Sequence, residues 1–149
     1  MPVDPTKLSE EQLLRLLLNC IKKSIVDGDP AAKEMAESCI AVMDARSAGS
    51  VGEPVLRRVG YRAGAQGLRW HDRKFLLDYI LEQPLPVRAH WSGDWGQPGS
   101  RQRYAKLRKT LLLYVQRFGG VPEMLHAETN WQHDAEYVRK CWQQKTKIQ

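Results

Sequence analysis

Apolar residues recur at intervals of three and four along most of this chain, and residues that start or stop helices bound each such stretch. Ser9 followed by Gln12 is typical of a capping box, and Gly28 ends the apolar stripe behind it. Ser100 precedes a second clear stripe, which Gly119 and Gly120 end. No stretch alternates apolar and polar residues for long enough to indicate a strand. The fold is therefore expected to be an all-α, compact bundle of about five helices. These helices are predicted at about 10–27, 30–46, 68 or 70 to 82, 101–118 and from 122 onward.

The 149 residues predict a single domain in four parts. The parts are an N-terminal helical hairpin, a flexible connection rich in Ser, Ala and Gly, a basic helical unit and a polar tail. They span residues 1–46, 47–54, 55–142 and 143–149. Prolines and glycines crowd residues 83–99, so a long loop that contains Trp91 and Trp95 is expected between the third and fourth long helices.

Composition narrows the class of protein. With 42% hydrophobic and 27% charged residues the chain can bury a core, and no apolar run approaches the ~18 residues of a membrane span. A cytoplasmic protein without a membrane partner is expected. Cys20, Cys39 and Cys141 are odd in number and lie inside apolar helical patterns, so they are interpreted as buried thiols rather than disulfides or zinc ligands.

Positive charge is concentrated in the middle of the chain. Residues 1–54 carry a net charge of −3, residues 55–118 carry +9 and residues 119–149 carry 0. Ten of the thirteen basic residues in the middle segment are Arg, whose planar guanidinium matches phosphate oxygens and stacks on bases. This preference favours nucleic-acid contact over a face kept basic only for solubility, although an ordinary solvated face and an acidic protein partner are the alternatives.

Two groups of basic residues are candidates for phosphate contact. One surrounds the glycine-rich segment 60–67, and the other lies outside the apolar stripe of the helix that follows Ser100. The candidates are Arg58, Arg62, Arg69, Arg73, Arg101, Arg103, Lys106, Arg108 and Lys109.

The tryptophans permit two interpretations. Trp91 and Trp95 lie near Arg88 and are candidates for stacking on unpaired bases; the alternative is that they fill the core under the long loop. Trp131 and Trp142 recur at helical spacing and are expected to be packing residues.

No catalytic, metal or cofactor site is predicted. The four histidines lack the i, i+4 spacing of a helical metal site, and no Gly-Lys-Ser/Thr loop end or Gly-x-Ser-x-Gly elbow is present. A catalytic site built from His71, Asp72 and His90 is a third hypothesis, which requires the three side chains to converge.

A set of residues in the second half of the chain resembles a pattern that recurs in bacterial helical domains of unknown activity. The resemblance covers residues 55–142 and implies one structural unit without defining an activity. The chain departs from the pattern at Gly119 and Gly120, where a basic tract is expected. The matching residues are Gly60, Tyr61, Arg62, Gly64, Gly67, Leu68, Arg73, Leu77, Leu85, Pro86, Trp95, Gly96, Pro98, Gly99, Ser100, Arg103, Trp131, Asp134 and Tyr137.

The resulting functional hypothesis is a non-catalytic protein that binds DNA or RNA through the phosphate backbone, with little reading of sequence. The alternative hypothesis is a helical subunit or adaptor of a larger bacterial nucleic-acid-processing or defence complex. It rests on the leucines at 13, 14, 16, 17 and 18, which surround more of the first helix than one core face requires.

Overall fold

The computed structural model describes residues 3–46, 56, 59–85 and 95–148. Within these ranges the chain forms five α-helices and two 3₁₀ turns and no strand, so the all-α prediction is confirmed. The chain divides into two compact units, Met1–Gly60 and Tyr61–Gln149. Among the described residues, no helix is both long and apolar enough to cross a membrane. The expected flexible connection and most of the expected Trp loop, including Trp91, lie outside the described ranges.

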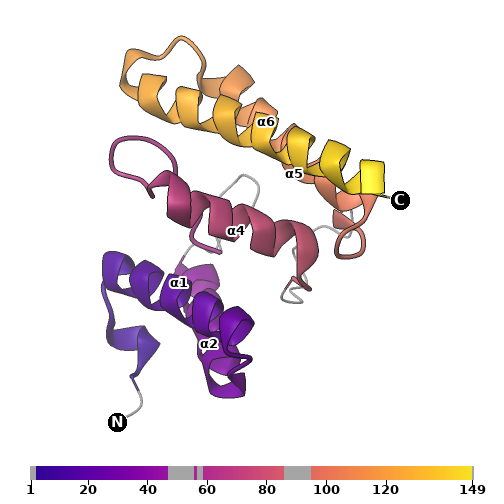
Figure 1. Cartoon of the computed structure of the whole chain (residues 1–149). Helices are drawn as coiled ribbons and strands as arrows, with labels where there is room; N and C mark the ends of the chain where they lie inside the picture. Colours follow the sequence, from indigo (N-terminus) through magenta and orange to yellow (C-terminus); the bar gives the residue numbers. More distant parts are fainter. Residues whose placement is uncertain (1–2, 47–55, 57–58, 86–94, 149) are drawn as a thin grey trace. The chain divides into compact units, whose positions relative to one another are not determined.

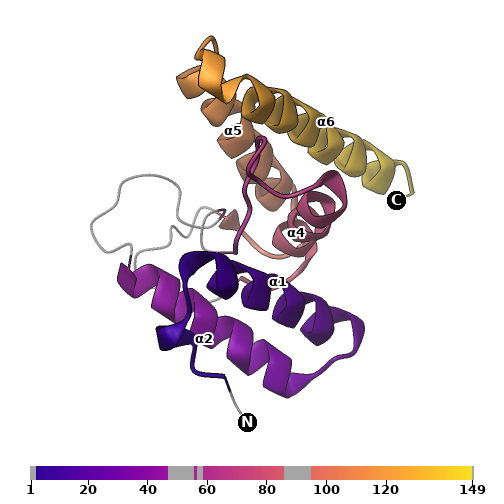
Figure 2. The same cartoon turned by 90° about the vertical axis from the view of Figure 1, so that its left-hand side faces the viewer.

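The first unit contains a helical hairpin, as predicted. The short turn η1 (Pro5–Lys7) precedes helix α1 (Glu10–Val26). Helix α2 (Pro30–Arg46) follows α1 and runs antiparallel to it (Figure 2). Ser9 and Gln12 form the predicted capping box, and the Asp29 carboxylate accepts hydrogen bonds from the first backbone N–H groups of α2. Gly28 has a φ of +65°, which lets the chain reverse between the two helices.

Apolar side chains from both helices form the core of the first unit. Leu13, Leu17 and Ile21 on α1 are fully buried, as are Cys39 and Ile40 on α2. Burial raises the pKa of the Cys39 thiol to about 11, which suits an unreactive core residue. Cys20 and Cys141 are free thiols that are only half-buried.

The second unit contains three helices: α4 (Trp70–Glu82), α5 (Arg101–Phe118) and α6 (Leu125–Ile148). Helices α5 and α6 lie side by side and antiparallel, joined through the turn η3 (Pro122–Met124) (Figure 1). Ser100 caps α5 as predicted, because its hydroxyl accepts a hydrogen bond from the Arg103 N–H. Residues 143–148, predicted to be a polar tail, instead continue α6, and the Thr146 hydroxyl donates to the Trp142 carbonyl within that extension.

The glycine-rich segment lies against the beginning of α6. The Gly64 N–H donates to the Asn130 side-chain oxygen at 2.9 Å. A Cβ on Gly64 would lie 3.3 Å from the Cβ of Ala127, and the φ of Gly64 is +97°. The close approach and the backbone conformation both favour glycine at this position.

A buried ion pair connects α4 to α6. The Arg73 Nε donates to Asp134 Oδ2 at 2.9 Å, and the Tyr61 hydroxyl donates to the same oxygen at 2.5 Å. Asp134 is fully buried and the exposed fraction of Arg73 is 5%, so the two charges compensate each other away from water. Burial and the adjacent Asp134 carboxylate raise the pKa of Tyr61 far above its ordinary value, so Tyr61 stays a proton donor.

Replacement of Asp134 by Ala is expected to destabilise the protein by about 3–5 kcal/mol, because it leaves the Arg73 charge buried without a partner. Urea unfolding at neutral pH measures the loss. Glu123→Ala is the control, since Glu123 is exposed on η3 and its loss is expected to change stability by less than about 0.5 kcal/mol. Equal stabilities of the two variants would contradict the structural role of the ion pair.

Candidate functional site

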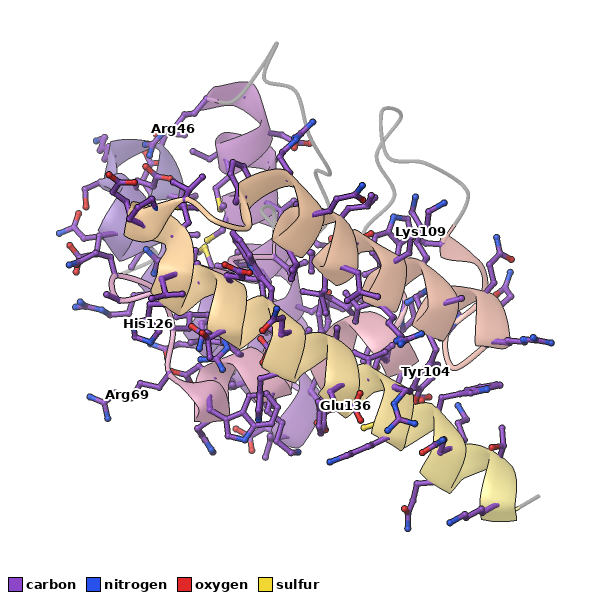
Figure 3. All side chains as sticks on the ribbon, turned by 90° about the horizontal axis from the view of Figure 1, so that it is seen from above. Arg46, Arg69, Tyr104, Lys109, His126 and Glu136 are labelled. Atoms are coloured by element: carbon purple, nitrogen blue, oxygen red, sulfur yellow. The ribbon has the colours of Figure 1, made fainter. Side chains whose placement is uncertain are left out.

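Three of the predicted phosphate-contact residues share the exposed face of α5. Arg101, Arg108 and Lys109 are exposed, and none of them forms an ion pair with another described residue. Arg101 and Arg108 are seven residues apart, so they lie two turns, roughly 10 Å, apart along the helix. Figure 3 shows Lys109 on the side of α5 away from α6. Arg108 interacts electrostatically with the Glu136 carboxylate, but that carboxylate is hydrogen-bonded to Arg139, so the face keeps an excess of positive charge.

Arg101 and Arg108 also border a groove between α5 and α6. The groove has a volume of about 320 Å³. It combines three guanidinium groups with two aromatic rings, two aliphatic side chains and one amide. Its lining residues are Arg101, Tyr104, Ala105, Arg108, Val138, Arg139, Trp142 and Gln143.

The aromatic floor of the groove is held in place by polar contacts. The rings of Tyr104 and Trp142 have centroids 5.1 Å apart and are tilted by 47°. The Tyr104 hydroxyl donates to the Glu82 carboxylate, and burial together with this hydrogen bond raises the pKa of Tyr104. Lys145 Nζ donates to Glu82 at 3.0 Å and to the Gly99 carbonyl at 2.7 Å. Tyr104 is buried whereas Trp142 is half-exposed, so Trp142 is the aromatic ring accessible to a ligand.

The α6 side of the groove carries a paired guanidinium. Arg139 donates two hydrogen bonds to the carboxylate of Glu136 on the same helix. The hydrogen bond from Arg139 holds the pKa of Glu136 below its ordinary value. The charge of Arg139 is therefore largely neutralised, and the unpaired positive charge lies on the α5 side.

A second hollow of about 350 Å³ adjoins Arg108 on α5. Arg108 and Lys109 line it together with Leu112 and Leu113, whose exposed fractions are 40% and 49%. The outer surface of α5 thus changes from basic to apolar along its length.

Arg103 does not belong to this exposed face. Its exposed fraction is 3%, and its guanidinium donates to four backbone carbonyls, at distances of 2.6–3.0 Å. The four acceptors are Ile80, Gln83, Trp95 and Gly96. The structure therefore does not support the predicted phosphate contact by Arg103. At 100° per residue Arg103 lies on the same side of α5 as buried Leu107, and its guanidinium donates hydrogen bonds to carbonyls at the end of α4.

Two further predicted contact residues, Arg73 and Trp95, are buried and therefore not available to a nucleic acid. Arg73 is engaged by Asp134 and by the Leu68 carbonyl, so its guanidinium is not available to a phosphate. Trp95 has an exposed fraction of 3% and fills the core, with Lys106 Nζ 5.9 Å from its ring centroid. Of the two interpretations of Trp95, packing is the one that fits its burial. Lys106 is half-buried beside that ring.

The basic residues of the glycine-rich segment are exposed but distant from the groove. Arg62 and Arg69 are exposed, and Figure 3 shows Arg69 at the opposite end of the unit from Tyr104 and Lys109. The glycine-rich segment contacts Ala127, fifteen residues before Trp142 on α6, which corresponds to about 22 Å along that helix. The two predicted basic groups do not form one surface, and Arg58 lies outside the described residues.

The residues behind the other two hypotheses are less favourably placed. Leu13, Leu14 and Leu17 are buried, and Leu16 and Leu18 are half-buried, so α1 exposes less leucine than the adaptor hypothesis assumed. His90, needed for the catalytic hypothesis, lies outside the described residues. In the part of the chain that the structure describes, no three His, Cys, Asp or Glu side chains gather as a metal site.

Sequence reasoning missed the α6 side of the groove. Trp142 was predicted to be a packing residue, and Arg139 and Gln143 were not singled out. A signal was available, because Arg139 and Gln143 are i, i+4 neighbours that lie on the same side of Trp142 on a helical wheel. Only the pairing of α6 with α5 brings them opposite Arg101 and Arg108.

Arg103→Lys is expected to lower the free energy of unfolding by about 2–4 kcal/mol, because one ammonium group cannot donate the hydrogen bonds that the guanidinium makes to four carbonyls. Urea unfolding measures the loss, and Arg101→Lys is the exposed control on the same helix. Equal and small losses in the two variants would contradict the structural role of Arg103.

The Glu82 contacts predict a pH-dependent contribution to stability. Burial raises the pKa of Glu82, but the hydrogen bonds from Tyr104 and Lys145 outweigh it and hold the pKa below 4.5. The ionised form is thus favoured by folding, and its contribution is lost as the pH falls through the lowered pKa. Glu82→Gln is expected to be less stable than the wild type at pH 7, by about 1 kcal/mol or less because the group is half-exposed. The gap should close toward pH 3 in urea unfolding, and a gap that stays constant with pH would contradict the assignment.

In the α5–α6 groove, the exposed cations Arg101 and Arg108 adjoin the accessible ring of Trp142. Comparison of the chain with known protein families, with curated proteins and with solved structures found no match.

Proposed function

We propose that the second unit binds nucleic acid through the phosphate backbone, and that the exposed face of α5 makes the contact. The observation that carries this proposal is the row of exposed cations, Arg101, Arg108 and Lys109, that have no ion-pair partner among the described residues. An unpaired surface cation loses little on binding a phosphate, because no internal ion pair must first be broken. The displaced counterions of the nucleic acid supply the driving force.

The geometry of the face suits backbone contact rather than base reading. Arg101 and Arg108 are two turns apart on one helix, and guanidinium groups bind phosphate oxygens through paired N–H donors. Contacts of this kind position a strand without reporting its sequence. Weak sequence preference and a steep dependence on salt are therefore expected of the complex.

The double variant Arg108→Gln/Lys109→Gln is expected to bind a labelled 20-nucleotide strand at least tenfold more weakly at about 50 mM salt, because two phosphate contacts are lost. The slope of log K against log salt concentration should fall by about 1.5. Fluorescence anisotropy across a salt series measures both quantities, with single-stranded and duplex DNA and RNA.

Arg62→Gln/Arg69→Gln is the matched control, since it removes the same charge from the other end of the unit. Its affinity is expected to stay within about twofold of the wild type. Equal losses in the two double variants would overturn the assignment to α5. Failure of every oligonucleotide to bind the wild type would overturn nucleic-acid binding itself and favour a protein partner, for which Leu112 and Leu113 provide exposed apolar surface.

A further inference from the structure

The groove between α5 and α6 contains aromatic rings, which contact with a phosphate backbone does not require. Its base is aromatic, and Trp142 is half-exposed there although it occupies a position on α6 whose apolar neighbours are buried. Val138, one turn earlier on the same face, has an exposed fraction of 1%. Trp142 lies at the border between the core and the groove, where its ring is still accessible.

The surroundings of Trp142 restrain the ring that a ligand would contact. Tyr104 packs against it at 5.1 Å, and Tyr104 is itself fixed through Glu82, which Lys145 holds from α6. A ring held in this way loses little side-chain freedom when a second ring stacks on it. The groove is thus organised for a flat group before any ligand binds.

The charge around Trp142 specifies an anionic ligand. Arg101 and Arg108 lie on the α5 side without ion-pair partners among the described residues, whereas Arg139 opposite them is paired with Glu136. The Gln143 side chain adds an amide that offers both donors and an acceptor. A ligand that carries phosphate next to a flat, hydrogen-bonding ring matches this arrangement.

The size of the groove separates paired from unpaired nucleic acid. A volume of about 320 Å³ is at the lower end of the range for small-molecule sites, so one base fits and a double helix does not. In a duplex the faces of the bases are covered by stacking on their neighbours, and exposing one face costs a few kcal/mol. An unpaired base in a single strand incurs little of this cost.

We infer that the α5–α6 groove takes an unpaired base of a single-stranded nucleic acid, stacked on Trp142, while Arg101 and Arg108 hold the adjoining phosphates. This inference rests on the proposed function and specifies its ligand. The protein therefore prefers single strands to duplexes, and the base contributes affinity that the phosphates do not.

The deciding experiment compares two labelled 12-nucleotide DNA strands, one with thymine at every position and one in which abasic sites replace all bases. The phosphates are the same in both strands. Wild-type protein is expected to bind the thymine strand about 5- to 150-fold more tightly than the abasic strand, as one stacked base would provide. Trp142→Leu should reduce that ratio to within about twofold of unity while binding the abasic strand like the wild type, and Trp142→Phe should retain most of the ratio.

The possible results separate this inference from the proposed function. Equal wild-type binding of the thymine and abasic strands, with a steep salt dependence, would overturn the stacked base and leave backbone binding in place. No binding of either strand at low salt would overturn the proposed function. Because Trp142 packs on Tyr104, each variant is checked by urea unfolding; if Trp142→Leu does not fold, the wild-type comparison of the two strands still decides.

Discussion

The second unit depends on the buried guanidinium of Arg103. The end of α4, at Ile80 and Gln83, and the segment at Trp95 and Gly96 present four carbonyl groups that need hydrogen-bond donors. One planar side chain supplies all four hydrogen bonds, which no other residue type can do from a single helix position. Burial lowers the pKa of Arg103, yet a guanidinium stays charged, so these bonds are charge-assisted. By fixing α5 at its first turn, Arg103 also determines which side of α5 faces outward.

Asp134 holds the other end of the unit in a related way. Its carboxylate accepts hydrogen bonds from Arg73 and Tyr61, and the adjacent His133 Nδ1 lies 3.0 Å from it. Together Arg73 and Arg103 show why a count of basic residues overstates a binding surface. Each of these two guanidinium groups donates hydrogen bonds to acceptors inside the protein. The cations available to a ligand are those without internal acceptors. Arg101, Arg108 and Lys109 meet that criterion within the described residues.

The groove gives the remaining cations a specific use. A basic helix face alone binds any polyanion, but the groove adds a restrained aromatic ring next to two unpaired guanidinium groups. Stacking and phosphate contact respond to different features of a nucleic acid, the first to exposed bases and the second to charge. Their combination on α5 and α6 distinguishes a single strand from a duplex without reading a sequence.

Local patterns in the sequence were sufficient to predict the helices. Capping by Ser9, Asp29 and Ser100 and the apolar stripes between the caps specify α1, α2 and α5, because these signals act over one or two turns. The exposed cations on α5 were predictable for the same reason.

The partners of Arg73 and Arg103 could not be predicted from local patterns. Asp134 and the Ile80 carbonyl are distant in sequence from these arginines and become their neighbours only when α4, α5 and α6 pack. The same packing places Trp142, an expected packing residue, against Tyr104 and leaves it half-exposed in the groove. Side-chain burial and ion pairing are set by contacts between elements, and a helical period in one element does not contain that information.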